Sequence, residues 1–246
     1  MGLYGGHNAE LILDYGCGPA NDIIGFIAYG NVKTVVGIDV SLKALQLAQH
    51  RLRLHGFTKK CELIWISDLA ENIPLRDESV DFLICAGVLH HVSKPEHVLS
   101  EFQRVLTAVG TGVLMVYNRD SLWYHLYVPY IKQILEEKFS GLTTDEAFRE
   151  TTDGPNCPIS RPYSPEELGS LCRHAGLNVD FMGGYFTLLC LDIYDRVKRG
   201  IIQPVDDPRL GKEHRKFLGE LKEDDQGYPM HHGKHVGIGG VYKIWK

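Results

Sequence analysis

The stretch LILDYGCGPAND, residues 11–22, decides the expected fold of this chain. Its apolar run ends at Asp14, glycines follow at Gly16 and Gly18, and a helix-like segment then begins. A strand that enters a helix through glycines lets a ligand approach the backbone and meet the helix N-terminus. The dinucleotide fingerprint G-x-G-x-x-G needs a further glycine where this chain has Asn21, so a nicotinamide dehydrogenase is disfavoured. The turn alone leaves open a tight connection that holds no ligand.

Length and composition predict one large domain over residues 1–246. The chain has 246 residues, of which 44% are hydrophobic and 23% charged, and this suffices for one sizeable core. The formal net charge of -5 gives no bulk attraction to a polyanion, so no nucleic-acid partner is expected.

Targeting signals and cysteine usage favour a cytosolic protein. The sequence has no run of about 18 apolar residues that would predict a membrane span. Its start, MGLYGGHNAE, lacks the apolar centre of a signal peptide. The six cysteines form no C-x-x-C pair, and several lie in apolar runs, as buried thiols of a reducing compartment do.

Short apolar runs alternate with helical patterns over the first half of the chain. Ser41 can cap one helix, and a capping-box pattern at 93–96 precedes another. Such alternation predicts an α/β fold with a doubly wound, mostly parallel sheet. The expected strands lie at residues 10–14, 34–38, 62–66, 80–85 and 113–117.

The alternation breaks after residue 118. An aromatic-rich segment at 119–157 is expected to be a helical insert or a substrate lid, and a second capping box follows at 164–167. A sixth strand is expected within 177–191, an irregular insert at 192–235, and a final strand at 236–245.

Acidic or small residues stand at four successive strand ends. Besides Asp14, these are Asp39, the pair Asp68 and Leu69, and Ala86 followed by glycine. An acid at the position of Asp39 can hydrogen-bond both ribose hydroxyls of an adenosine, and in such sheets ligands bind outside the carboxyl ends of the strands. The coincidence of four strand ends is more specific than any single one.

These motifs resemble the class I S-adenosylmethionine-dependent methyltransferases. LDYGCGPA is similar to the first motif of that family, GIDVS to its ribose-binding motif, and SDLAENIPLRDESVDFLICAGVLHHV to its third and fourth motifs. PEHVLSEFQRVLTAVGTGVLMV resembles a segment of the small-molecule branch that includes quinone-biosynthesis enzymes.

The resemblance implies a Rossmann-like sheet of seven strands in the order 3-2-1-4-5-7-6, the last antiparallel, and S-adenosylmethionine as cofactor. It implies methyl transfer to an O, N or C atom of a small-molecule substrate by in-line displacement. The cofactor-binding residues implied are Asp14, Gly16 and Gly18 at the methionine end, Asp39 and Val40 at the ribose, Asp68 and Leu69 at the adenine, and Ala86 at the fourth strand end.

Several side chains are candidates for the chemistry on the substrate. His90 and His91 follow the fourth strand, and either can act as a base, although a structural role for the pair stays open. Arg161 can clamp a carboxylate or phosphate, with Tyr163 beside it, or form a surface ion pair. Trp123 can belong to a substrate lid or to a packed helix.

Three histidines near the C-terminus suggest a metal site only weakly. His231, His232 and His235 lie in a loop-like stretch, and no cysteine or acid with ligand spacing accompanies them, so no metal site is expected.

Two other functional classes stay open. An RNA or protein methyltransferase is disfavoured because the chain lacks N-P-P-Y, the signature of the resembled family for methylation of amide and adenine nitrogens. Residues 86–89 stand in its place. A catalytically inactive methyltransferase-like binding protein is the other alternative. Only about nine residues precede the first strand, where the family usually carries covering helices, so the chain is expected to be truncated or its site closed by another element.

Overall fold

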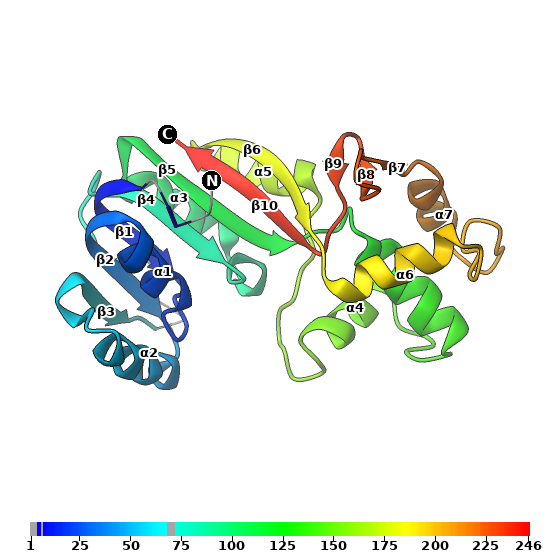
Figure 1. The fold of residues 1–246 in the computed structure, drawn as a ribbon, viewed down its shortest axis with the longest axis horizontal. Coiled ribbons are helices and arrows are strands. Elements are labelled where there is room, and N and C mark those ends of the chain that lie inside the picture. Colours follow the sequence, from blue (N-terminus) through cyan, green and yellow to red (C-terminus); the bar gives the residue numbers. More distant parts are fainter. Residues whose placement is uncertain (1–3, 6, 68–71) are drawn as a thin grey trace.

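A seven-stranded sheet forms the centre of the computed structural model, which describes residues 4–5, 7–67 and 72–246 (Figure 1). The strands run in the order β3-β2-β1-β4-β5-β10-β6, and β10 is antiparallel to both of its neighbours. The expected order is thereby confirmed, with the last strand inserted between the fifth and the sixth. The strands are β1 (Asn8–Tyr15), β2 (Asn31–Asp39), β3 (Cys61–Trp65), β4 (Val80–Ala86), β5 (Leu106–Tyr117), β6 (Asn178–Tyr185) and β10 (Gly239–Trp245).

Helices cover both faces of this sheet and bury its apolar side chains. On one face pack α1 (Asn21–Tyr29) and α2 (Leu42–Leu54), and on the other α3 (Pro95–Val105) and α5 (Pro165–His174). The fully buried Phe26 and Phe102 anchor the two layers, and burial of such a side chain contributes about 1.5–3 kcal/mol. Both faces therefore hold a core, and the strand ends stay free for a site.

Two of the three predicted helix caps are confirmed. Ser41 Oγ accepts a hydrogen bond from Ala44 N, and Ser164 forms a reciprocal capping box with Glu167. The box expected at 93–96 is wrong, because Lys94 is the N-cap of α3 and its side chain makes no capping bond. Proline occupies the first helical position in both α3 and α5, so the cap is the residue directly before it.

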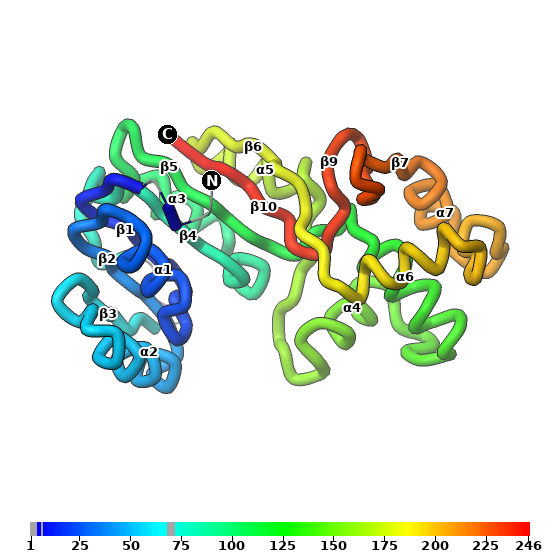
Figure 2. The backbone as a smooth tube through the Cα atoms, in the orientation of Figure 1, coloured from blue at the N-terminus to red at the C-terminus, as the bar shows by residue number. Residues whose placement is uncertain are grey.

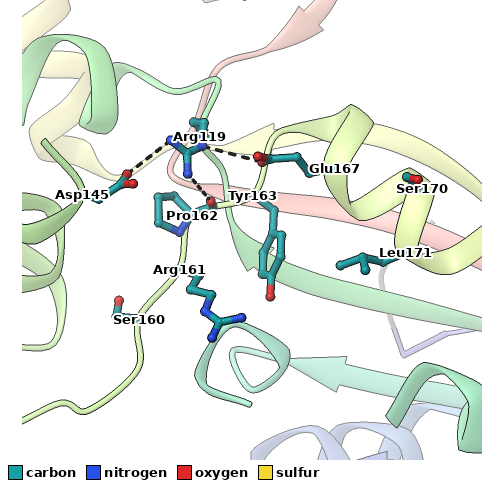
Figure 3. Close-up of a pocket in the computed structure, with 9 residues that line it drawn as sticks. All are labelled: Arg119, Asp145, Ser160, Arg161, Pro162, Tyr163, Glu167, Ser170 and Leu171. Atoms are coloured by element: carbon teal, nitrogen blue, oxygen red, sulfur yellow. Dashed lines mark hydrogen bonds and ion pairs between the residues drawn. The ribbon is translucent and has the colours of Figure 1, made fainter. Parts of the chain in front are cut away.

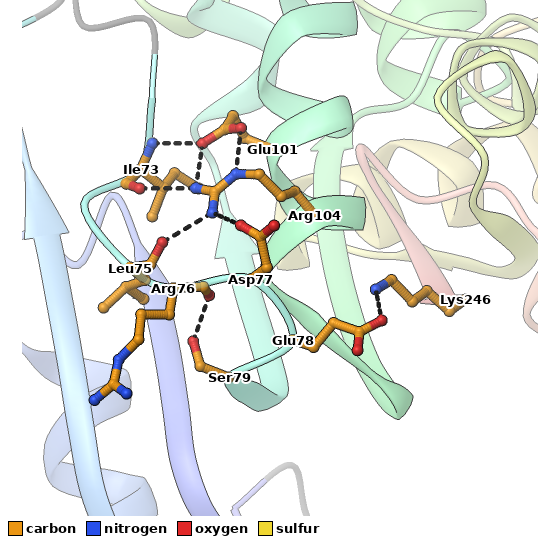
Figure 4. Close-up of polar contacts among 9 residues, drawn as sticks. All are labelled: Ile73, Leu75, Arg76, Asp77, Glu78, Ser79, Glu101, Arg104 and Lys246. Atoms are coloured by element: carbon orange, nitrogen blue, oxygen red, sulfur yellow. Dashed lines mark hydrogen bonds and ion pairs between the residues drawn. The ribbon is translucent and has the colours of Figure 1, made fainter.

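Arg104 fastens the loop before β4 onto α3 (Figure 4). Its guanidinium donates to the carbonyls of Ile73 and Leu75, to Asp77 Oδ1 at 2.6 Å, and to both carboxylate oxygens of Glu101 at 2.7 Å. Glu101 also accepts from Ile73 N at 2.7 Å. The Glu-x-x-Arg spacing on one helical face thus fixes the chain that leads from β3 to β4.

The remaining elements form a second part with its own apolar core, at the right of Figures 1 and 2. Residues 192–235, expected as an irregular insert, contain most of one helix, a second helix and three short strands. The elements of this part are η3 (Trp123–Leu135, a π-helix), α4 (Thr144–Thr152), α6 (Leu188–Lys198), α7 (Lys212–Gly219), β7 (Lys222–Glu223), β8 (Pro229–His231) and β9 (Lys234–His235). Two single-turn 3₁₀ helices, η1 (Thr58–Lys60) and η2 (Leu89–His91), lie in the first part.

None of the helices in the described part of the chain has the length and apolar character needed to cross a bilayer. All six cysteines are free thiols.

Candidate functional site

The glycine turn lies between β1 and α1 and is tied to the end of β2. Gly16 N and Cys17 N both donate to Ile38 O, at 2.7 and 3.0 Å. A Cβ atom on Gly16 would lie 2.1 Å from a Val88 methyl group, whereas one on Gly18 would meet nothing within 4 Å. Gly16 is therefore required by packing. Gly18, with φ +50°, borders open space in which a ligand can lie against the backbone.

Asp14 ends β1 with a carboxylate that the protein leaves unsatisfied. The residue is 2% exposed, and its Oδ2 atom has no hydrogen-bond partner among the described residues. Burial raises the pKa of this carboxyl well above its ordinary value, and the nearby Asp22 and Asp39 raise it further. Since a buried, unpaired carboxylate is costly, its lone pairs are suited to a cationic donor from a ligand.

Asp39 links the turn to the end of β2. Its Oδ2 accepts from Gly18 N at 2.8 Å and its Oδ1 from Ser41 N at 2.7 Å. Each carboxylate oxygen keeps a second acceptor position, so both can still receive a hydroxyl. The neighbouring Val40 is 55% exposed, and its carbonyl accepts from Trp65 Nε1.

The other predicted cofactor residues are Asp68, Leu69 and Ala86. Asp68 and Leu69 lie outside the described residues. Ala86 ends β4 in a half-buried position, and the following Gly87 has φ +78° and donates from its amide to Met115 O. Apart from 68–69, the strand ends chosen from the sequence lie at one edge of the sheet, because β1, β2 and β4 are parallel neighbours.

His90 is a packed, neutral side chain. It is buried, its Nδ1 accepts from Tyr117 N at 3.3 Å, and its ring stacks on the Tyr117 ring at 4.0 Å. Burial lowers its pKa to about 3, and the neighbouring His91 lowers it too. His90 therefore joins η2 to β5 and is uncharged at neutral pH.

His91 has a defined tautomer and an accessible second nitrogen. Its Nδ1 lies 2.7 Å from Ile159 O, and because a carbonyl only accepts, Nδ1 carries the hydrogen. The Nε2 atom lies 3.8 Å from Asp153 Oδ1, and the side chain is 33% exposed. Cys157 Sγ lies 3.6 Å from Nδ1 and also contacts Ile159 O. The lone pair of His91 is thus on Nε2, beside a carboxylate.

Asp153 is held in place by three hydroxyl groups. Its Oδ1 accepts from Tyr117 OH at 2.9 Å, and its Oδ2 accepts from Ser160 Oγ at 2.6 Å and from Thr152 Oγ1 at 3.0 Å. Burial opposes the charge, but the hydrogen bonds and His91 outweigh it and hold the pKa of Asp153 below its ordinary value. The group stays ionised next to His91.

Ser160, which bonds Asp153, also lines a cavity of about 630 Å³ (Figure 3). Tyr163, 7% exposed, contributes a hydroxyl that lacks a hydrogen-bond partner in the described structure, and Arg161 lies next to it. Burial raises the pKa of Tyr163, which the Arg161 guanidinium partly counteracts. The lining residues are Arg119, Asp145, Ser160, Arg161, Pro162, Tyr163, Glu167, Ser170 and Leu171.

The two arginines of the cavity differ in their pairing. Arg119 lies 3.3 Å from Asp145 and 3.6 Å from Glu167, so its charge is already compensated. Arg161 forms no ion pair with the carboxylates of the described residues, and its backbone amide donates to His90 O at 3.1 Å. Arg161 is therefore a cation available to a ligand, placed directly beside η2.

Trp123 does not line this cavity. It is buried in the core of the second part, where its Nε1 donates to Thr151 Oγ1 at 3.1 Å and its ring packs on Tyr127. Its polar atom is already used within the fold.

Several known proteins are similar to this chain in sequence and fold. Residues 13–114 match the family model described as a methyltransferase domain. The ubiquinone biosynthesis O-methyltransferase of Thiobacillus denitrificans is 30% identical over 173 residues, which span 70% of this chain and 66% of that protein. Residues 13–114 of this chain are thus similar to a methyltransferase domain, and the sheet has the strand order of the Rossmann-like methyltransferase fold.

Two further proteins are similar to this chain. The probable methyltransferase ltbC of Aspergillus luteorubrus is 27% identical over 177 residues, 70% of this chain and 58% of that protein. The YcgJ protein of Bacillus subtilis has the same fold, with a TM-score of 0.60 at 18% identity over 96% of this chain and 92% of that one. The chain spans slightly less than two thirds of the length of the curated relatives it matches.

The cofactor that the methyltransferase-domain match implies is S-adenosylmethionine, and the residues present fit it. The unpaired Asp14 oxygen suits the ammonium group at the methionine end, and the open space at Gly18 admits a ligand beside the backbone. Sequence reasoning did not single out Asp153, Ser160 or Cys157. They follow no motif, and only the return of the 153–160 segment to η2 brings them to His91.

Proposed function

We propose that this chain transfers the methyl group of S-adenosylmethionine to a hydroxyl oxygen of a small molecule that carries an anionic group. The single observation that carries the proposal is the tautomer of His91, whose free Nε2 lies beside an ionised carboxylate. Several relatives are named as ubiquinone biosynthesis O-methyltransferases, and this supports an oxygen atom as the methyl acceptor.

The cofactor supplies an electrophilic methyl group on a sulfonium centre, so the protein has to position the acceptor and remove its proton. His91 Nε2 receives the hydroxyl proton, and the imidazolium that forms is stabilised by Asp153 Oδ1, 3.8 Å away. Asp153 cannot turn away, because Tyr117 OH and Ser160 Oγ hold its two oxygens. A base of this kind typically contributes about 10²–10⁴ in rate.

Substrate recognition is assigned to Arg161 and Tyr163. A guanidinium without a carboxylate partner binds a carboxylate or phosphate through charge-assisted hydrogen bonds. The Tyr163 hydroxyl can donate to the same anion, since nothing in the described structure occupies it. Ser160 lines the cavity and also bonds Asp153, so it connects the cavity to the carboxylate beside His91.

The strand-end residues are assigned to the cofactor. Asp14, Gly16 and Gly18 hold its methionine end, Asp39 and Val40 its ribose, and Ala86 lies near the bound molecule. Asp68 and Leu69 are proposed at the adenine from the sequence motif alone.

We further propose that the domain extends over 1–246, with 119–157 as a helical insert or lid. The free cysteines favour a cytosolic location.

The test is incorporation of label from methyl-labelled S-adenosylmethionine into a metabolite extract, followed by mass identification of the product. The proposal expects a methyl ether of an anionic small molecule, formed by the wild-type chain and not by His91→Gln. Labelled RNA or protein, or a product methylated on nitrogen or carbon, would contradict it.

A further inference from the structure

A second cluster of ligating side chains lies far from the strand-end site, where α7 meets the hairpin of β8 and β9 (Figure 1). Glu220 follows the last residue of α7, His231 ends β8, and His232 begins the turn to β9. His231 Nε2 lies 3.2 Å from Glu220 Oε2, and one ligating atom from each of the three residues lies within 4.8 Å of the others.

The backbone of the turn places two consecutive histidines on one side. Neighbouring residues of a strand normally point to opposite faces. His232 has φ +49°, in the left-handed region, and Gly233 follows with φ +74°. The rings of His231 and His232 therefore face the same space, with centroids 4.0 Å apart.

The first ligand is preorganised and the other two are open. The His231 side chain is 13% exposed and packs against the Phe217 ring at 4.6 Å. Glu220 and His232 are exposed, so solvent reaches the remaining coordination positions. This combination of one half-buried ligand and two exposed ones allows a cation to enter without rearrangement of the core.

The local charge favours a cation. Asp120, just after β5, interacts electrostatically with both His231 and His232. A second carboxylate thus lies near the imidazoles in addition to Glu220. The cation near Glu220 is Lys216, whose Nζ lies 3.9 Å from the other oxygen of that carboxylate.

We propose that Glu220, His231 and His232 bind a divalent transition metal of the zinc class. Two imidazoles and one carboxylate are a common ligand set for Zn²⁺, with an open position for water, whereas Mg²⁺ and Ca²⁺ prefer oxygen ligands alone. The histidines alone suggest this site only weakly, because the acid comes from a helix end rather than from the histidine stretch. The proposal does not depend on the proposed methyl transfer.

The experiment is titration of Zn²⁺ into the untagged full chain by calorimetry, with Co²⁺ absorption as a second readout. The site predicts one strongly bound Zn²⁺ per chain and a visible Co²⁺ spectrum. His232→Ala and Glu220→Gln, both at exposed positions, should each weaken binding by roughly tenfold to a hundredfold. The matched control is His235→Ala, because His235 lies in the same hairpin but bonds Asp224.

The controls separate this site from other ligands in the chain. His235→Ala and Cys157→Ser should leave the affinity unchanged, the latter because His91, Asp153 and Cys157 form another ligating group. Absence of saturable binding in the wild type overturns the proposal. So does loss of binding in Cys157→Ser with retention in His232→Ala, or an equal loss in His235→Ala and His232→Ala.

Discussion

His91 Nε2 lies 3.8 Å from Asp153 Oδ1, while His91 Nδ1 donates its hydrogen to Ile159 O, so the two ring nitrogens have separate roles. The adjacent His90 is instead buried and accepts a backbone hydrogen bond through its Nδ1. Two consecutive histidines thus differ in what they can do, and this difference can be measured.

His91→Gln should lower kcat by roughly 10²–10⁴ and leave the affinity for S-adenosylmethionine unchanged, because only the proton acceptor is lost. His90→Gln should mainly reduce stability, with kcat per folded molecule retained. The measurement is steady-state kinetics together with denaturant unfolding of both variants. A large kcat loss in His90→Gln with none in His91→Gln would show that His90 is the proton acceptor and that His91 has the structural role.

Asp153→Asn should lower kcat per folded molecule and leave the affinity for S-adenosylmethionine unchanged. The Asp153 carboxylate lies 3.8 Å from His91 Nε2, so its neutralisation removes the charge that stabilises the imidazolium formed during proton transfer. A purely structural role would lower the amount of folded protein but leave kcat per folded molecule unchanged. Steady-state kinetics together with denaturant unfolding of both proteins distinguishes the two roles.

Asp14→Asn should stabilise the ligand-free chain while weakening cofactor binding. The raised pKa of Asp14 means that its neutral form is favoured in the fold, so stability is lost as pH rises from the unfolded value through the folded one. Removal of the charge should raise the unfolding free energy at neutral pH by about 1 kcal/mol. Denaturant unfolding at acidic and neutral pH measures this, and an unchanged pH slope in the variant would show that Asp14 is not the cause.

Buried histidines should make the fold sensitive to acid. Burial lowers the pKa of His90 and of His125 to about 3, from an ordinary value of 6.5. The stability associated with these groups is present above pH 6.5 and lost as pH falls toward 3, because the unfolded chain takes up protons that the folded chain does not.

His125→Phe tests this expectation for the second part of the fold. His125 Nδ1 lies 2.9 Å from His214 Nδ1, so the two rings share one hydrogen in the neutral state. The variant should take up roughly one proton fewer on unfolding in mild acid. Unfolding free energies measured from pH 7 to pH 5 give this slope, and the exposed His50→Gln is the control, whose slope should match that of the wild type.

Arg161→Ala should raise KM for an anionic substrate by roughly tenfold or more, since a charge-assisted hydrogen bond is lost. The affinity for S-adenosylmethionine should not change. Arg53→Ala, on the exposed face of α2, is the matched control. The assignment fails if the KM of Arg161→Ala equals that of the wild type, or if the substrate identified by product analysis bears no negative charge.

The sheet and the cofactor edge could be predicted from the sequence because they depend on local patterns. An apolar run predicts a buried strand, and the acidic residue that closes it, Asp14 or Asp39, predicts a carboxylate at the end of that strand. The capping box at 93–96 failed because the position of a proline decides which residue is the cap. Asp153 and Glu220 could not be predicted, since each reaches its histidine only through contacts between distant segments.

Calorimetric titration of S-adenosylmethionine into the intact chain, beside Asp39→Ala and the control Asp180→Ala, measures whether the strand ends bind the cofactor. One-to-one binding is predicted in the wild type and in Asp180→Ala, whose side chain is exposed on β6 at the far edge of the sheet. Asp39→Ala should bind roughly tenfold more weakly or worse. No binding heat at millimolar cofactor, or an unchanged affinity in Asp39→Ala, would contradict the account.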